Sequence, residues 1–190
     1  MNRTLLLAGA AAMALTLAAC NKKPDEAAMG APDANPAATI PTPSDEAAAP
    51  DFVNKAAASD TFEVESSRIA LDRSSNSEVK AFASMMVEAH TKSTEDLKAA
   101  IAGSGLALTP PTTLPDDKAS ALQDLRSASA GDFDKKYMDA QVDGHQGALD
   151  LMTRYAQDGD NPSLKAAAAT MAPVIQQHLD KARALRDALK

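Results

Sequence analysis

A connector near the middle of the chain decides the fold: GSGLALTPPTTLPDDKASALQDLRSASAGD, residues 103–132. It contains Pro110, Pro111 and Pro115, followed by a short amphipathic segment from Asp116 to about Ser127. Two long segments with apolar residues at helical spacing precede it and two follow it, and no segment alternates as a strand does. Short links within each pair predict antiparallel hairpins. A connector of about thirty residues can cross a helix of roughly 25 residues, near 37 Å at 1.5 Å per residue.

Two hairpins joined by one long crossover form a ferritin-like bundle. The sequence therefore predicts an all-α, ferritin-like four-helix bundle, with a long crossover between its second and third helices that carries a short extra helix. An up-down bundle with an elaborated loop remains open.

Capping residues place the first two long helices. The first is expected to begin with Asp51 as its N-cap and to end near Arg73. The second is expected to begin with a capping box of Ser75 and Glu78 and to end at Gly103. The inner face of the first is predicted to hold Val53, Ala57, Val64 and Leu71, with Phe52, Ala56 and Glu63 beside them. The second carries Val79, Phe82, Met86, His90, Leu97 and Ile101 at helical spacing.

The third and fourth long helices follow the connector. The third is predicted from about Phe133 to Asp158, and the fourth opens with Asn161 as N-cap and Pro162 at the first helical position. The inner stripe of the third holds Phe133, Tyr137, Gln141, His145, Ala148, Met152 and Ala156. The fourth keeps a three-four spacing through Leu164, Ala168, Met171, Ile175, His178, Ala182, Leu185 and Leu189.

The N-terminus resembles a lipoprotein signal. Residues 5–17 form an apolar segment too short to span a bilayer as a stable helix. The order Ala18-Ala19-Cys20 that follows resembles the lipobox of bacterial lipoproteins. We therefore expect residues 1–19 to be removed and Cys20, the only cysteine, to be acylated. Asn21 rather than Asp follows it, so the resemblance implies an anchor on the periplasmic side of the outer membrane.

Residues 20–50 are predicted to be a disordered tether that begins at the lipidated cysteine. Six of the eleven prolines lie between 21 and 50, with much Ala and almost no large apolar residue. Such a segment cannot bury enough surface to order itself, and fully stretched it reaches at most roughly 100 Å. The folded domain is then 51–190.

The charge of the chain limits its partners. The formal net charge is -7, and it becomes -8 when Arg3 leaves with the signal. A negative protein is a poor ligand for nucleic acid or anionic headgroups, so we expect no nucleic-acid partner and membrane contact through the acyl chains alone. The sequence does not specify a protein partner, a cell-wall partner or an oligomeric state.

The three histidines are the candidates for chemistry. His90, His145 and His178 each occupy an inward position on a different long helix, and Glu63 of the first helix can face the same interior. Neutral imidazoles bind zinc, copper, iron or nickel, and a buried carboxylate is costly without a cation or donor. This set predicts a transition-metal site, with zinc, copper or iron as the ion. The alternative is that each histidine is a core residue hydrogen-bonded to Gln141, Ser67, Thr94 or Glu63.

Several reaction classes lack their residues. A carboxylate-bridged di-iron centre needs a Glu three residues before the histidine on two helices, whereas Val87, Val142 and Ile175 stand there. There is no Gly-x-Ser-x-Gly elbow, no phosphate loop and no second cysteine. The methionines at helical spacing indicate core packing more than copper(I) ligands. No pattern identifies an enzymatic reaction.

Five stretches of the sequence, taken in their order and spacing, resemble a known family. They are Phe62-Glu63-Val64-Glu65, Glu78-Val79-Lys80-Ala81-Phe82-Ala83, Met86-Val87-Glu88-Ala89-His90, Phe133 to His145, and Ala172-Pro173-Val174-Ile175 with His178. Together they resemble the bacterial domain of unknown function DUF4142, over nearly all of 51–190. The resemblance implies a ferritin-like helical fold and an envelope location, and it lends no reaction. It also leaves open a supporting role for the acidic Glu88, two residues before His90.

Two hypotheses of different class follow. In the first, the chain is a periplasmic lipoprotein that binds a metal through His90, His145, His178 and Glu63, for sequestration, sensing or redox chemistry. In the second, it is a non-enzymatic interaction or stress-related envelope protein whose histidines are core residues.

Overall fold

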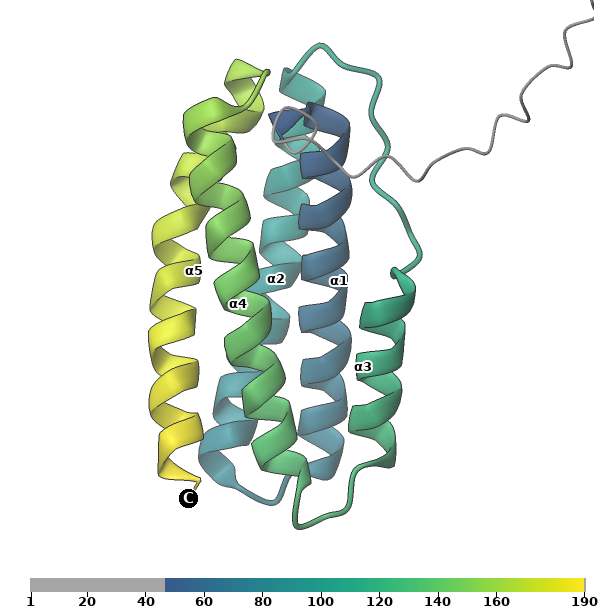
Figure 1. Ribbon diagram of the computed structural model, residues 1–190, viewed down its shortest axis with the longest axis vertical. Coiled ribbons are helices and arrows are strands. Elements are labelled where there is room, and N and C mark those ends of the chain that lie inside the picture. The colour runs from purple at the N-terminus through teal and green to yellow at the C-terminus, as the bar shows by residue number, and fades with distance from the viewer. Residues whose placement is uncertain (1–46, 190) are drawn as a thin grey trace, which may run out of the picture. The chain divides into compact units, whose positions relative to one another are not determined.

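The computed structural model describes residues 47–189 (Figure 1). Within them lie five α-helices and no strand: α1 Ala49–Arg73, α2 Ser77–Gly103, α3 Asp116–Ser127, α4 Phe133–Asp158 and α5 Pro162–Ala188. This confirms the predicted all-α fold, with the short helix in the connector. The signal-like segment, Cys20 and most of the predicted tether lie outside the described residues. Of the described helices, none combines the length and apolarity needed to cross a membrane.

The connector sets the topology. The α1–α2 and α4–α5 pairs are antiparallel hairpins, and the crossover runs from the end of α2 back along the bundle to the start of α4 (Figure 1). α1 packs on α2 and α4, and α5 packs on α4 and α2, so α2 and α4 are diagonal and parallel. This is the ferritin-like arrangement, and it excludes the up-down alternative.

Two of the predicted helix starts need correction. α1 begins at Ala49 with Pro50 in its first turn, so Asp51 is not the N-cap; it lies in the first turn and pairs with Lys55 at 2.8 Å. α2 is capped by Asn76 and not by Ser75, because the Asn76 side chain accepts from two backbone N–H groups of the first turn. The predicted Asn161 cap of α5 is confirmed.

The interior consists of two apolar layers at opposite ends of the bundle. The first layer surrounds Phe52 and Tyr155, whose rings stack at 3.9 Å, and includes Leu97 and Leu164. The second surrounds Phe82, Phe133, Tyr137 and Leu179, among others. Between them the buried side chains are polar: Asp60, Glu63, Ser66, Ser67, His90, Gln141, His145 and His178.

The buried face of α1 differs from the predicted one. Val64 and Leu71 are only partly buried, whereas Asp60, Glu63 and Ser67 are buried. The stripe continues the three-four spacing of Phe52 and Ala56 through these polar residues. The prediction followed apolar residues alone and so placed the buried face wrongly, because the middle of the buried stripe is polar.

α3 is fastened to the bundle by Arg73. Leu122 and Leu125 of α3 are buried, and α3 packs against α1 and α4. The Arg73 guanidinium donates to the carbonyl oxygens of Leu125, Arg126 and Ala128, beyond the end of α3's own hydrogen bonds. These contacts satisfy the last carbonyls of the helix and hold the crossover against α1.

Candidate metal centre

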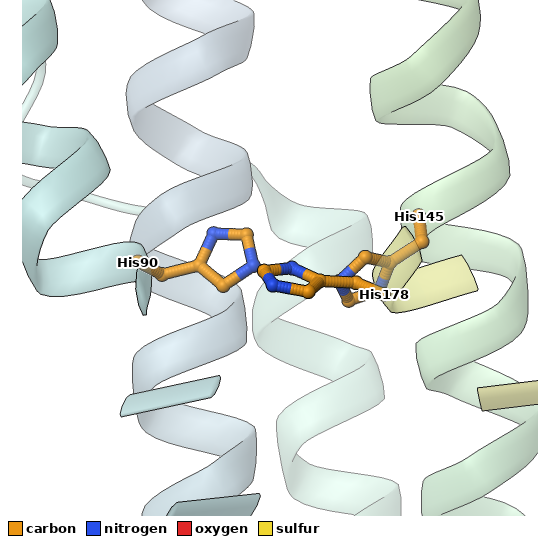
Figure 2. A group of neighbouring side chains, drawn as sticks. All are labelled: His90, His145 and His178. Carbon is orange, nitrogen blue, oxygen red and sulfur yellow. The ribbon is translucent and has the colours of Figure 1, made fainter. Parts of the chain in front are cut away.

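Three histidines from three helices meet in the polar layer. His90 of α2, His145 of α4 and His178 of α5 are 4%, 1% and 9% exposed, as expected for inward positions. Their ring centroids are 5.4, 5.7 and 5.6 Å apart, nearly an equilateral triangle. One nitrogen from each lies within 4.8 Å of the other two. Figure 2 shows the three rings converging on a common point.

The outer nitrogens of two rings are fixed by acceptors. Nδ1 of His90 lies 2.8 Å from Oδ1 of Asp60, and Oγ1 of Thr94 donates to Oδ2 of the same carboxylate at 3.3 Å. Nδ1 of His145 donates to the carbonyl oxygen of Gln141 at 2.8 Å. A carboxylate and a carbonyl only accept, so both rings carry hydrogen on Nδ1. In the neutral rings, both Nε2 atoms are therefore lone-pair acceptors.

These two acceptor nitrogens face each other. Nε2 of His90 lies 3.4 Å from Nε2 of His145. Two lone pairs at this distance repel unless a proton or a cation lies between them. Nitrogens bound to one tetrahedral ion at about 2.0–2.1 Å stand about 3.3–3.4 Å apart, so this pair has the spacing of two ligands of one ion.

His178 completes the triangle. Its Nδ1 is buried without a hydrogen-bond partner, which is costly for a polar atom. Burial, followed by the charges of His145 and His90, lowers the pKa of His178 to about 4. Burial and the charge of His90 likewise lower the pKa of His145 to about 4. Both rings are thus neutral near pH 7, the form that binds metals.

His90 is the ring that holds a proton best. Burial alone lowers the pKa of His90, but the hydrogen bond that its Nδ1 donates to Asp60 and the charges of Glu63 and Asp60 outweigh this effect, so its pKa is raised. A proton on Nε2 of His90 can donate to His145. A metal ion and this proton compete for one place, so binding of the ion displaces the proton.

Glu63 lies beside the outer nitrogen of His145. Its carboxylate is 1% exposed, neither oxygen has a hydrogen-bond partner, and Oε1 is 3.8 Å from Nδ1 of His145. Burial raises the pKa of Glu63 to about 7, against the opposing charge of His90. The structure therefore brings the three predicted histidines together and sets Glu63 at the outer nitrogen of His145.

Gly144 makes room for this carboxylate. A Cβ at Gly144 would stand 2.6 Å from Oε1 of Glu63, closer than atoms pack. The sequence shows a poor helix former directly before His145 and gives no reason for it. The structure supplies a reason, because any larger residue there would displace the Glu63 carboxylate.

Asp60 is the site residue that sequence reasoning missed. It lies one turn before Glu63 on the true stripe of α1, a spacing that could have revealed it once polar residues were counted. Other proposed partners bind elsewhere: Ser67 shares a hydrogen bond with Tyr137 at 2.8 Å, and Thr94 reaches Asp60 and the backbone oxygen of His90. Glu88 is exposed on α2.

The described methionines belong chiefly to the packing. Met86, Met138 and Met152 are fully buried within the two apolar layers, and Met171 packs against the first of them. This agrees with the interpretation of methionine as gap-filling core. The donor set at the centre is therefore three imidazoles with two carboxylates nearby.

Comparisons with known proteins agree with the architecture. A solved structure described as a DUF305 fragment from Deinococcus radiodurans superposes with a TM-score of 0.61 at 14% identity, covering 76% of this chain and 94% of that one. At this identity the likeness shows the fold alone. No curated protein matches the chain. The profile of a domain of unknown function, DUF4142, matches residues 33–185. The chain belongs to the DUF4142 family.

Proposed function

We propose that the bundle binds one transition-metal ion through His90, His145 and His178, in the service of sequestration, sensing or redox chemistry. The observation that carries this is the distance of 3.4 Å between Nε2 of His90 and Nε2 of His145. Both atoms carry lone pairs, because the Nδ1 hydrogens of both rings are held by acceptors. When the rings of His90 and His145 are neutral, neither supplies a hydrogen for this gap, and a cation fills the same place. His178, which has one ring nitrogen within 4.8 Å of the other two ligand atoms, gives the ion a third ligand.

The buried carboxylates support the same proposal. A divalent ion with three neutral imidazoles carries a charge of +2, which is costly in a bundle interior unless opposite charge lies near. Asp60 and Glu63 supply two negative charges within the same layer, and both are at most 5% exposed. With both carboxylates ionised, which a bound cation favours, the assembly is neutral. Glu63 acts first as this counter-charge, and it becomes a direct ligand if its side chain swings toward the ion.

The donor type narrows the ion. Imidazole nitrogens suit zinc, copper and iron, and thioethers and thiolates are absent from the three-nitrogen group. Three protein ligands leave a coordination position for water or a small ligand, as in metal sites that exchange ligands. We therefore expect Zn²⁺ or Cu²⁺ to bind more tightly than Mn²⁺.

We propose further that the protein works as a lipoprotein on the periplasmic side of the outer membrane. The support is the order of signal-like residues, Ala18-Ala19-Cys20 and Asn21 in the sequence. Replacing Cys20 by Ser should move the protein from the membrane fraction to the soluble fraction. A Cys20→Ser protein that stays with the membrane would contradict the anchor.

The stoichiometry of the bound ion tests the function. The full chain, purified in detergent without a metal-binding tag, is loaded with Zn²⁺, dialysed and subjected to elemental analysis. We expect about one ion per chain, lost in His90→Ala and His145→Ala and kept in Gln176→Ala, which changes only a surface hydrogen bond of α5. If the wild type retains no ion, the histidines are core residues, and the second hypothesis of a tethered interaction protein replaces the metal site.

A further inference from the structure

One cavity formed by the described residues lies directly outside the centre. It is a cleft of about 680 Å³ between α1, α4 and the crossover residues 111–118. Gly144 and Gly147 of α4 form part of its wall. Because Gly144 has no side chain, the carboxylate of Glu63 lies immediately behind it, with Oε1 only 2.6 Å from where a Cβ would stand.

From this juxtaposition we infer that the cleft, called here the α1–α4 cleft, is the route by which a hydrated divalent transition-metal ion reaches the three histidines, with Glu63 as the first buried carboxylate it meets. The inference rests on the proposed function and adds where the ion comes from. An ion leaving water needs an oxygen ligand before it reaches imidazoles, since a bare cation in an apolar interior is prohibitively costly.

Glu63 has the properties this step requires. Both of its oxygens are buried without a well-formed hydrogen bond, so they are available to bind a cation. Oε1 also lies 3.8 Å from a nitrogen of His145, so the carboxylate adjoins a ring of the centre as well as the cleft wall. The outer wall adds the exposed carboxylates of Asp117 and Asp143.

The two lysines of the cleft do not close it to cations. Lys55 is paired with Asp51 at 2.8 Å, and the ammonium of Lys118 lies over the Phe62 ring, 5.0 Å from its centroid. The crossover wall is itself held in place at its far end by Arg73. The uncovered side of the cleft is therefore the part of α4 that carries Gly144 and Gly147.

A second cleft reaches the centre from the other side and is less suited. It measures about 280 Å³, lies between α1 and α2, and includes Asp60 in its lining. Asp60 is already bound to His90 and Thr94, so an arriving cation would have to compete with both hydrogen bonds. Side chains of Thr61, Arg68 and Lys98 line it, and no glycine does.

Binding kinetics test the route. Co²⁺ alone is mixed with the full chain in detergent, and its visible spectrum reports coordination by the histidines. Gly147→Leu fills the α1–α4 cleft, because a Cβ at Gly147 meets nothing within 4 Å. Thr153→Leu places the same side chain on an exposed part of α4 outside this cleft. Thr61→Leu adds bulk to the second cleft.

We expect Gly147→Leu to slow both association and dissociation of Co²⁺ by about tenfold or more with an unchanged dissociation constant, and the other two variants to match the wild type. Equal rates in all four proteins, or slowing by Thr61→Leu alone, would overturn the route and leave the metal site intact. A wild type that shows no Co²⁺ spectrum would instead overturn the proposed function and the route with it.

Discussion

The apolar ends of the bundle and its polar middle layer are built on opposite principles. At the ends, large apolar side chains such as Phe52, Tyr155 and Phe82 are fully buried and close-packed. In the middle, the same four helices bury two carboxylates, three imidazoles and an amide. Burial of apolar surface at the ends stabilises the folded state, whereas the middle contains polar atoms without partners.

This contrast indicates that the apolar ends stabilise the fold and that the middle layer serves another purpose. Burying polar groups without full pairing lowers the free energy of unfolding, so apolar side chains of similar size would make the middle layer more stable. The apolar ends are sufficient to hold the helices in register around it. A ligand that supplies the missing partners would turn the costly layer into a stabilising one.

The largest expected effect belongs to an apolar end. Replacing Phe52 by Ala removes a ring stacked on Tyr155 and should lower the free energy of unfolding by about 3–5 kcal/mol. The ions bound per folded chain should stay unchanged, because this layer does not touch the three nitrogens. Denaturant unfolding and elemental analysis measure the two quantities. Loss of the ion from folded Phe52→Ala protein would show that the layers are not independent.

The next effect is a dependence on pH in the middle layer. Burial raises the pKa of Glu63 from 4.5 to about 7, so the folded protein holds a proton that the unfolded chain has released between these values. Its contribution to stability therefore falls as the pH rises from about 4.5 to about 7. In metal-free protein, Glu63→Gln should gain about 3 kcal/mol relative to wild type over this window, at 1.36 kcal/mol per unit.

Chemical unfolding at a series of pH values measures this difference. The control is Glu65→Gln, on the same helix, whose side chain is 43% exposed beside Arg126. This control measures the effect of removing a carboxylate at an exposed position of the same helix. A Glu63→Gln difference that is flat from pH 4.5 to 7 would contradict a buried, titrating carboxyl.

A smaller effect should separate positioning from folding. Asp60→Asn weakens the hydrogen bond that fixes the hydrogen of His90 on Nδ1. Loss of such an outer partner lowers metal affinity by about 10–100-fold. Asp96→Asn, which alters an exposed ion pair with Lys92 on α2, should leave the affinity unchanged. Competition titration with a chromophoric chelator gives both values, and equal affinities would remove Asp60 from the centre.

The smallest effect compares two glycines one turn apart. Ala normally stabilises a helix by about 0.5–1 kcal/mol relative to Gly, and Gly147→Ala should show this gain because nothing lies near its Cβ. Gly144→Ala should lose it or become destabilising, because the new Cβ meets Oε1 of Glu63. Combining Gly144→Ala with Glu63→Ala should restore the gain. Thermal unfolding resolves the pair, and equal gains at both positions would place Glu63 elsewhere.

The fold was predictable from the sequence because connector length and helical periodicity are local quantities. The 103–132 connector and the Asn161-Pro162 start follow from residues alone. The inward histidines were also predictable, since each sits on an otherwise apolar stripe. The Asp60 contact and the buried face of α1 were not predictable, because the buried stripe of α1 is polar at the level of the three histidines. The role of Gly144 depends on a neighbour 81 positions away and has no local signal.

The central claim is that the three imidazoles hold one ion, and X-ray absorption of the bound ion tests it most directly. The full chain is loaded with one equivalent of Zn²⁺, and the scattering around zinc is recorded for the wild type and for His178→Leu. We predict imidazole nitrogens at about 2.0–2.1 Å, three in the wild type and two or fewer in the variant. A zinc environment of oxygen atoms alone, identical in both proteins, would contradict the account.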